Sequence, residues 1–272
     1  MANLKFKQVD VFTDKPFLGN PVAVVVGAEG LDTAAMQRIA CWTNLSETTF
    51  LLPSKVADYK LRIFTPRQEL PFAGHPTIGS AHAAIESQFT KVTNGKVTQE
   101  CGVGIIDLSV EDGKIFLKAP QAKIADVRGK LPFAQKLLRV DVGPVWIVGE
   151  VASAAALAAL EPDMAALTQF SIDFEATGIT VFAESKTSES GIEVRSFAPA
   201  HGIAEDPVCG SGNISVAAYL RATNQLDRFG NRYIARQGMQ MGRDGRVSVR
   251  VEADSIRIGG HSVTCVEGTL RT

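Results

Sequence analysis

The sequence has few cysteines, few histidines and no excess of either charge. Its four cysteines, Cys41, Cys101, Cys209 and Cys265, form no C-x-x-C pair. They therefore support neither a disulfide framework nor a structural zinc site, and four histidines without metal-ligand spacing predict no metal site. The net charge of -1, without a Lys/Arg cluster, argues against binding to nucleic acid or to an anionic membrane.

Long apolar runs are also missing. No segment approaches the roughly 20 apolar residues of a membrane span. The opening residues, MANLKFKQVDVF, lack the apolar core and small-residue cleavage site of a secretory signal, so we expect a cytoplasmic protein. What the chain does have is a 45% apolar composition over 272 residues, enough for one large domain or two ordinary ones.

Three segments from the first half of the chain recur, in the same order, in the second half. The pairs are QVDVFTDKPFLGNPVAVVVG (8–27) with RVDVGPVWIVGE (139–150), LRIFTP (61–66) with VRSFAP (194–199), and AGHPTIGSAHAA (73–84) with VCGSGNISVAAY (208–219). This ordered repetition predicts two similar half-domains of roughly 130 residues, an ordinary domain size. We assign residues 1–122 to the N-terminal half, which the last strand, about 260–272, can join, and residues 123–259 to the C-terminal half.

The local patterns predict the same kind of structure in each half. Expected elements of the first half are a hairpin of strands 5–12 and 21–26, a helix from its cap Asp32 to about Asn44, and strands 48–52 and 59–65. Residues 76–86 and 211–221 are small or apolar on nearly every side, which is typical of a buried helix. The sequence therefore predicts an α+β fold in which a curved, mostly antiparallel sheet wraps round a central helix in each half.

Both predicted central helices begin in turns with free backbone N–H groups. These turns are Gly74-His75-Pro76-Thr77 and Cys209-Gly210-Ser211-Gly212, and Pro76 suits the first helical position. If the halves pack about an approximate two-fold axis, both positive helix ends face one cleft. The ligand expected there is a small carboxylic acid.

Five segments carry a resemblance to a known family. They are VDVFTDKPFLGNPVAVV, SETTFLL, FTPRQELPFAGHPTIGSAHA, RSFAPAHGIAEDPVCGSGN and the ending GRDGRVSVRVEADSIRIGGHSVTCVEGTL. Together they resemble the PhzF-like isomerases of phenazine biosynthesis over almost the whole chain. The resemblance implies the diaminopimelate epimerase-like fold with two pseudo-symmetric halves, no cofactor or metal, and a homodimer.

The resemblance also bears on which residue moves a proton. Fold-mates that racemise amino acids use two thiols, one at each helix start, but the repeat pairs Cys209 with Gly74, which carries no proton. The PhzF-like pattern uses one glutamate that takes a proton from one carbon and returns it to another on the same face. The matching position is Glu47, whose alternative is a solvated loop carboxylate. As a general base it should have a pKa raised by partial burial.

His75 and Asp206 match other polar site residues of that family. The resemblance implies that His75 donates a hydrogen bond to the substrate and that Asp206 binds a substrate amine or orients His75. The alternatives are a capping or dimer-facing histidine and a turn-forming aspartate before proline.

The remaining candidates would bind the substrate. They are Gly74, Gly210 and Ser211 as donors to a carboxylate, Cys209 as a residue lining the pocket, and Asn20 facing the same cleft. The alternative for Asn20, which precedes a proline, is a turn residue. Glu205, beside Asp206, is expected to be solvated.

Three functions follow as hypotheses. The first is an isomerase that moves a proton within a small cyclic or unsaturated amino or hydroxy acid, trans-2,3-dihydro-3-hydroxyanthranilate or a related compound. The second is an amino-acid racemase or epimerase with Cys209 as one base and Glu47 or His75 as the other. The third is a non-catalytic protein that binds a small anion.

Overall fold

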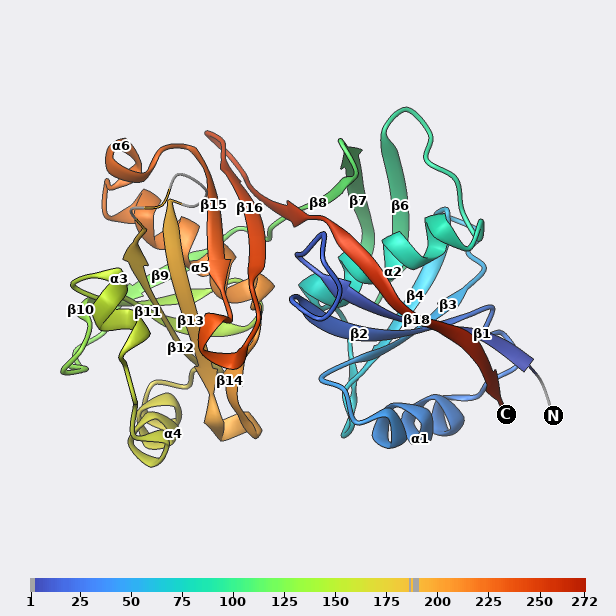
Figure 1. Ribbon diagram of the computed structural model, residues 1–272, viewed down its shortest axis with the longest axis horizontal. Coiled ribbons are helices and arrows are strands. Elements are labelled where there is room, and N and C mark those ends of the chain that lie inside the picture. The colour runs from blue at the N-terminus through green and yellow to red at the C-terminus, as the bar shows by residue number, and fades with distance from the viewer. Residues whose placement is uncertain (1–2, 186, 188–190) are drawn as a thin grey trace. The chain divides into compact units, whose positions relative to one another are not determined.

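The computed structural model describes residues 3–185, 187 and 191–272, and the chain forms two compact units (Figure 1). The first unit comprises Met1–Leu117 and Gly259–Thr272, and the second comprises Lys118–Ile258. The first unit ends at Leu117, five residues before the boundary expected at 122. The second unit ends at Ile258, one residue before the boundary expected at 259. The closing strand of the chain belongs to the first unit.

The first unit is built mainly of strands. Its strands are β1 (Asn3–Val11), β2 (Asn20–Val26), β3 (Thr48–Leu52), β4 (Tyr59–Phe64), β5 (Glu69–Leu70), β6 (Lys96–Cys101), β7 (Gly104–Glu111), β8 (Lys114–Lys118) and β18 (Ser262–Arg271), and its helices are α1 (Thr33–Thr43) and α2 (Gly74–Glu86). Strand β17 (Ile256–Gly260) crosses the boundary between the units, as does β8 at its last residue, Lys118. The pairs β1–β2, β1–β18, β3–β4 and β6–β7 are antiparallel, whereas β2–β3 and β4–β6 are parallel.

The second unit repeats this pattern. Its elements are β9 (Lys123–Asp126), β10 (Gln135–Asp141), β11 (Val145–Glu150), α3 (Ala154–Ala158), α4 (Met164–Asp173), β12 (Gly178–Glu184), β13 (Ile192–Ala198), η1 (Pro199–His201), β14 (Ile203–Asp206), α5 (Gly210–Ala222), α6 (Leu226–Phe229), β15 (Arg232–Gln237), η2 (Met239–Met241) and β16 (Gly245–Val251). Pairs β10–β11, β12–β13 and β15–β16 are antiparallel, and β11–β12 and β13–β15 are parallel. The order of parallel and antiparallel pairs is thus the same in both units.

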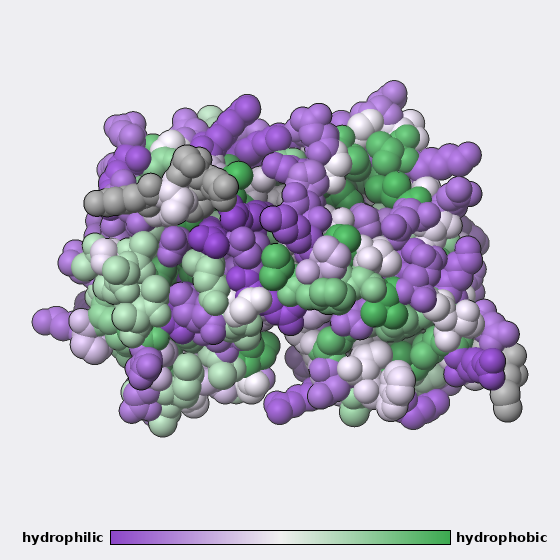
Figure 2. Space-filling model, in the orientation of Figure 1, coloured by the Kyte–Doolittle hydropathy of each residue, from purple (hydrophilic) through white to green (hydrophobic). Residues whose placement is uncertain are grey.

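Each unit holds one buried central helix. Helix α2 packs against β1, β2, β3 and β18, and α5 packs against β10, β11, β12 and β16. Nearly every residue from His75 to Ala84 is buried, as is every residue from Gly212 to Leu220. Polar residues cover much of the face drawn in Figure 2, as expected when the apolar residues lie inside. The predicted arrangement of a mostly antiparallel sheet around a central helix is confirmed in each unit, and each sheet also contains parallel pairs.

The helix ends agree with the sequence at α1 and differ at α2. Asp32 caps α1 by accepting a hydrogen bond from Ala35 N at 2.7 Å, and Asn44 ends it in the left-handed conformation. Helix α2 begins at Gly74, so the expectation that Pro76 opens it was wrong. A proline at the third position costs nothing, because the first-turn N–H groups have no acceptor within the helix. In the described part of the chain, no helix is long and apolar enough to cross a membrane.

Candidate active site

Glu47 and His75 lie side by side in the first unit. Glu47 precedes β3, and its backbone is held by β2, because Ala23 N donates to Glu47 O at 3.3 Å. His75 is the second residue of α2. Oε2 of Glu47 lies 3.2 Å from Nε2 of His75, and the two side chains are 15% and 8% exposed. The sheet and the helix start thus bring together two predicted site residues that are 28 positions apart in the chain.

The carboxyl group of Glu47 has an unusual environment. Burial raises its pKa to about 7, against a smaller opposite effect of a hydrogen bond with Ser46. Near neutral pH both the ionised and the protonated forms are therefore populated. A carboxyl group in this state can accept a proton and return it.

Asn20 contacts the other side of the imidazole. This first residue of β2 is buried, and its Nδ2 lies 3.4 Å from Nδ1 of His75. An amide nitrogen only donates, so this contact makes Nδ1 the acceptor. The proton of a neutral imidazole then resides on Nε2, which faces Glu47. Asn20, predicted as a substrate-binding residue, lies where it orients His75.

Cys209 is the N-cap of α5 in the second unit. Its Sγ accepts a hydrogen bond from Gly212 N at 3.2 Å, and the residue is 3% exposed. Burial raises the pKa of the thiol well above its usual value, and the negative charge of Asp206 raises it further. The thiol is therefore protonated at neutral pH and is a poor base, although it stands at the positive end of a helix.

A buried glutamine ties the start of α5 to the strand before it. Gln237 Oε1 accepts from Cys209 N at 3.1 Å and from Asn213 Nδ2 at 2.9 Å, while its Nε2 donates to Asp206 O at 2.9 Å. Oδ1 of Asp206 accepts from Val208 N at 3.1 Å, as in a turn. Sequence reasoning missed Gln237, because nothing local distinguishes it from other polar residues of a strand.

Ser211 has a partner that the sequence did not reveal. Nε1 of Trp146, on β11, donates to Ser211 Oγ at 2.9 Å across 65 residues of chain. Trp146 is 3% exposed. The only signal in the sequence was the position of this tryptophan inside the repeated segment 139–150.

The strand registers define which residues of the two units are equivalent. Thr49 of β3 faces the central helix of the first unit, since its Oγ1 lies 2.8 Å from Ser80 Oγ, and Thr180 of β12 faces that of the second, since a Cβ on Gly212 would lie 2.8 Å from its Oγ1. With these two threonines equivalent, the pair Ala23 and Thr48 of the first unit corresponds to the pair Ile147 and Ile179 of the second. Glu47 directly precedes Thr48 and Gly178 directly precedes Ile179, so Glu47 corresponds to Gly178. One residue before Ala23 and Ile147, Val22 corresponds to Trp146.

The helix caps extend this correspondence and correct one prediction. Ala73 and Cys209 are the N-caps of two 13-residue helices, and both have extended backbone angles. Cys209 therefore matches Ala73 and not Gly74, which matches Gly210. His75 then matches Ser211. The conclusion that Cys209 has no thiol counterpart in the first unit is unchanged, since alanine carries no ionisable group.

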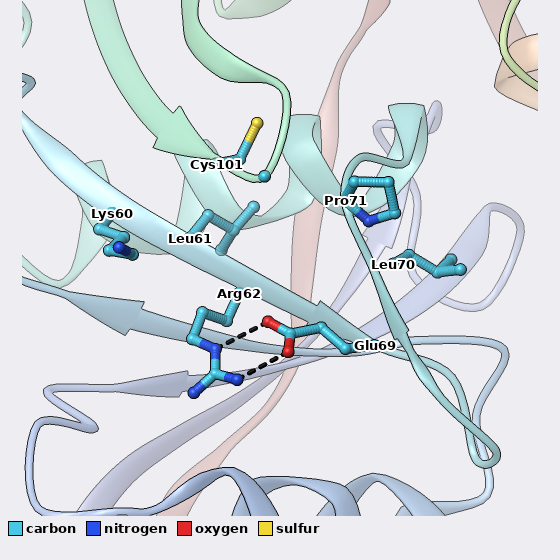
Figure 3. A pocket seen from close by; sticks show the side chains of 8 residues that line it. Lys60, Leu61, Arg62, Glu69, Leu70, Pro71 and Cys101 are labelled. Atoms are coloured by element: carbon cyan, nitrogen blue, oxygen red, sulfur yellow. Dashed lines mark hydrogen bonds and ion pairs between the residues drawn. The ribbon is translucent and has the colours of Figure 1, made fainter.

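An arginine–glutamate pair precedes each helix start by a similar spacing. In the first unit Arg62 Nε and Nη2 donate to Glu69 Oε1 and Oε2, both at 2.7 Å, beside a hollow of about 430 Å³ (Figure 3). In the second unit Arg195 binds Glu205 in the same bidentate way. The expectation that Glu205 is solvated was wrong: its side chain is only 11% exposed. A carboxylate is buried there because the guanidinium neutralises it.

The structure thus divides the predicted residues between the units. Glu47, His75, Asn20 and Gly74 lie in the first, and Asp206, Cys209, Gly210 and Ser211 lie in the second. Over the described residues, no three His, Cys, Asp or Glu side chains gather in a way that could hold a metal ion.

Comparison with known proteins places this geometry in a family. A family model described as phenazine biosynthesis-like protein matches residues 9–268. The Schizosaccharomyces pombe protein antisense-enhancing sequence 1 is 38% identical over 98% of this chain and 99% of its own. The trans-2,3-dihydro-3-hydroxyanthranilate isomerase of Pseudomonas aeruginosa is 32% identical over 97% of this chain and 98% of its own. A crystal structure of a PhzF-family phenazine biosynthesis protein from Bacillus anthracis, 25% identical, covers 100% of both chains with a TM-score of 0.90. The predicted α+β, diaminopimelate epimerase-like fold class is confirmed.

Proposed function

This chain belongs to the phenazine biosynthesis-like protein family and is a PhzF-like isomerase, and we propose that it moves a proton within a small cyclic or unsaturated amino or hydroxy carboxylic acid. The observation that carries the proposal is the buried carboxyl group of Glu47, with a pKa of about 7, held 3.2 Å from His75. A general base and acid works best when its pKa lies near the operating pH. Relatives named trans-2,3-dihydro-3-hydroxyanthranilate isomerase indicate the class of substrate to test first.

The proposed reaction uses one residue twice. The ionised carboxylate of Glu47 takes a proton from one substrate carbon, and the electrons of the broken C–H bond delocalise into the conjugated system. The carboxylic acid that results returns the proton to another carbon on the same face, which restores the ionised enzyme. His75, with its proton on Nε2, stabilises negative charge that develops on the substrate.

The second unit supports one-base over two-base chemistry. At Gly178, the position equivalent to Glu47, a Cβ would lie 2.1 Å from the carbonyl oxygen of Phe197, so no side chain fits there without movement of the backbone. The remaining candidate for a second base, Cys209, has a raised pKa. A racemase that uses Cys209 as one base and Glu47 or His75 as the other is therefore disfavoured.

We also propose that the reaction needs no cofactor. Transfer of a proton between two carbons changes no oxidation state, and Glu47 with His75 supplies the acid, the base and the charge stabilisation. Activity is expected to survive exhaustive dialysis against EDTA. Loss of activity that a divalent metal restores would contradict this part of the proposal.

The decisive experiment follows proton exchange in deuterated water. Wild type incubated with trans-2,3-dihydro-3-hydroxyanthranilate and with related cyclic acids should isomerise at least one of them, with deuterium appearing at the carbon that gains the proton, as measured by NMR. Glu47→Gln should reduce the rate at least 100-fold, because general acid–base catalysis contributes about 10²–10⁴. Glu29→Gln, a change at an exposed glutamate of the same unit, is the matched control. Unchanged turnover in Glu47→Gln would reject the mechanism, and inversion at an α-carbon would favour a racemase.

A further inference from the structure

The contact between Trp146 and Ser211 limits what the serine hydroxyl can do. A hydroxyl group has one proton to donate and two lone pairs to accept, whereas an indole N–H only donates. Because Trp146 Nε1 donates to Ser211 Oγ at 2.9 Å, one lone pair of the hydroxyl is occupied. The hydroxyl proton then points to another acceptor.

Two acceptors compete for that proton. One is Sγ of Cys209, which lies 3.6 Å from Ser211 Oγ. Sulfur is a weak acceptor, and burial keeps this thiol protonated by raising its pKa. The other is an oxygen atom of a bound ligand, since Ser211 is in the first turn of α5 and is partly exposed. A carboxylate oxygen is the stronger acceptor of the two, because hydrogen bonds to charged groups are stronger than neutral ones.

The indole of Trp146 occupies space that is open because residue 178 is a glycine. Trp146 is paired in register with Gly178, and a Cβ on Gly178 would lie 2.9 Å from Cζ3 of Trp146. In the first unit the position of Gly178 is held by Glu47, and that of Ser211 by His75. The repeat thus places a carboxyl–imidazole pair in one unit and an indole–hydroxyl pair at the corresponding place in the other.

We propose that Trp146 is a positioning residue that fixes the Ser211 hydroxyl as a hydrogen-bond donor to the carboxylate of the ligand. This inference rests on the proposed function, in which the ligand is a carboxylic acid. It assigns the second unit a neutral donor pair that binds a carboxylate group. Donation from the indole also polarises the hydroxyl, so its own donated hydrogen bond is strengthened.

The chain offers a direct probe of this contact. It has two tryptophans, and Trp42 is 77% exposed on α1. Trp42→Phe protein labelled with ¹⁵N at the indole therefore gives one indole N–H signal, from Trp146, and should keep the activity of the wild type. The probe ligand is cis-2-aminocyclohexanecarboxylate, and its control is the matching carboxamide. The signal is expected to move on addition of the carboxylate and on Ser211→Ala substitution, and to move less with the carboxamide.

Ligand affinity completes the test. Trp146→Phe keeps an aromatic ring and removes the N–H. It should weaken binding of the carboxylate about tenfold, as expected when the hydrogen bond that orients the Ser211 hydroxyl is lost. Ser211→Ala should weaken it at least as much, and the double variant should bind no worse than Ser211→Ala alone, because the indole acts through the hydroxyl.

Separate outcomes overturn the inference and the proposed function. Weakened binding in Ser211→Ala with unchanged binding in Trp146→Phe would reject the role of Trp146 and leave the carboxylate site intact. If Trp146→Phe does not fold, an indole signal that stays in place on addition of the carboxylate rejects the inference by itself. Absence of any carboxylate binding by the wild type would reject both.

Discussion

Arg195 and Glu205 form a bidentate ion pair inside the second unit. Arg195 Nε lies 2.9 Å from Glu205 Oε1, Nη2 lies 2.8 Å from Oε2, and Nη1 donates to the carbonyl oxygens of Leu157 and Leu160. Every nitrogen of the guanidinium is thus used within a buried site. Arg62 and Glu69 make the same pair at the equivalent place of the first unit, but with side chains 21% and 39% exposed.

This difference in burial predicts unequal contributions to stability. Glu205→Gln should lower the free energy of unfolding by about 3–5 kcal/mol, because it leaves a buried guanidinium without its counter-ion. Glu69→Gln should cost less than about 1 kcal/mol, as is typical of exposed pairs. Urea unfolding of the two variants provides the comparison. Equal losses would show that burial does not govern these pairs.

The pKa of Glu47 predicts the pH dependence of the reaction. As the base, Glu47 must be ionised when it takes the first proton. Its pKa of about 7 therefore predicts that kcat/KM rises with pH through an apparent pKa near 7 and then levels off. Initial rates measured from pH 5 to pH 9 would show this rising limb of the pH profile of kcat/KM. A limb near pH 4.5 would mean that Glu47 titrates as an ordinary solvated carboxyl group.

The raised pKa of Glu47 also predicts how stability depends on pH: the free energy of unfolding should fall as pH rises, whereas kcat/KM should rise. The folded protein binds the Glu47 proton more tightly than the unfolded chain does, since the pKa of this group is about 7 when folded and 4.5 for an ordinary solvated glutamate. The contribution of Glu47 to stability is therefore complete below about pH 4.5 and is lost as pH rises through 7. Glu47→Gln should be more stable than wild type at pH 8, by about 1–3 kcal/mol, and this advantage should shrink towards pH 5. Urea unfolding at both pH values checks the sign, and an advantage that grows on acidification would contradict it.

Asn20 is expected to act through His75. Asn20→Ala removes the donor to Nδ1, and with it a contact that favours the imidazole proton on Nε2. We predict a fall in kcat of about tenfold, the cost of one hydrogen bond to a positioned group, with little change in KM. Asn20→Ser, which keeps a hydroxyl donor, should retain more activity than Asn20→Ala. A change confined to KM would instead support direct contact between Asn20 and the substrate.

Cys209 is expected to be dispensable for catalysis. Its thiol is buried, protonated and engaged as the helix cap. Cys209→Ser keeps a capping atom, since serine is a favoured N-cap residue, and should leave turnover within a few-fold of the wild type. Iodoacetamide at pH 7.5 should label the exposed Cys41 before Cys209, as mass spectrometry of peptides would show. Loss of activity in Cys209→Ser comparable to that in Glu47→Gln would return the thiol to the reaction.

Local sequence patterns predicted the architecture well. The three repeated segments are the hairpins, strands and central helices of the two units, because side-chain periodicity and turn residues act over short distances. Asp32 and Asn44 marked the ends of α1 for the same reason. The resemblance of the motifs to a family then pointed to Glu47 and His75, but not to their separation or to the environment that raises the pKa of Glu47.

Contacts between distant segments lay outside local patterns. No local pattern around Glu205 indicates that Arg195 is its partner. The sequence therefore predicted a solvated carboxylate, whereas the fold buries the Glu205 side chain against Arg195. Trp146 and Ser211 are 65 residues apart, and their contact depends on the packing of α5 against β11. The one-residue error in pairing Cys209 with Gly74 has the same origin, since only the caps of α2 and α5 set the correspondence.

The sequence by itself determined the internal repeat, the two central helices, the first strands and the outer helix of the first half, and the residue types available for chemistry, because these depend on neighbours along the chain. The tertiary structure decided which of those residues meet and in which ionisation state. It placed Glu47 beside His75 in a site dry enough to raise the pKa of the carboxyl group, and it placed Trp146 against Gly178 at the equivalent position of the second unit. Burial and register are properties of the packed chain, so the difference between a proton-moving pair and a fixed donor pair arises only when the strands and the central helices come together.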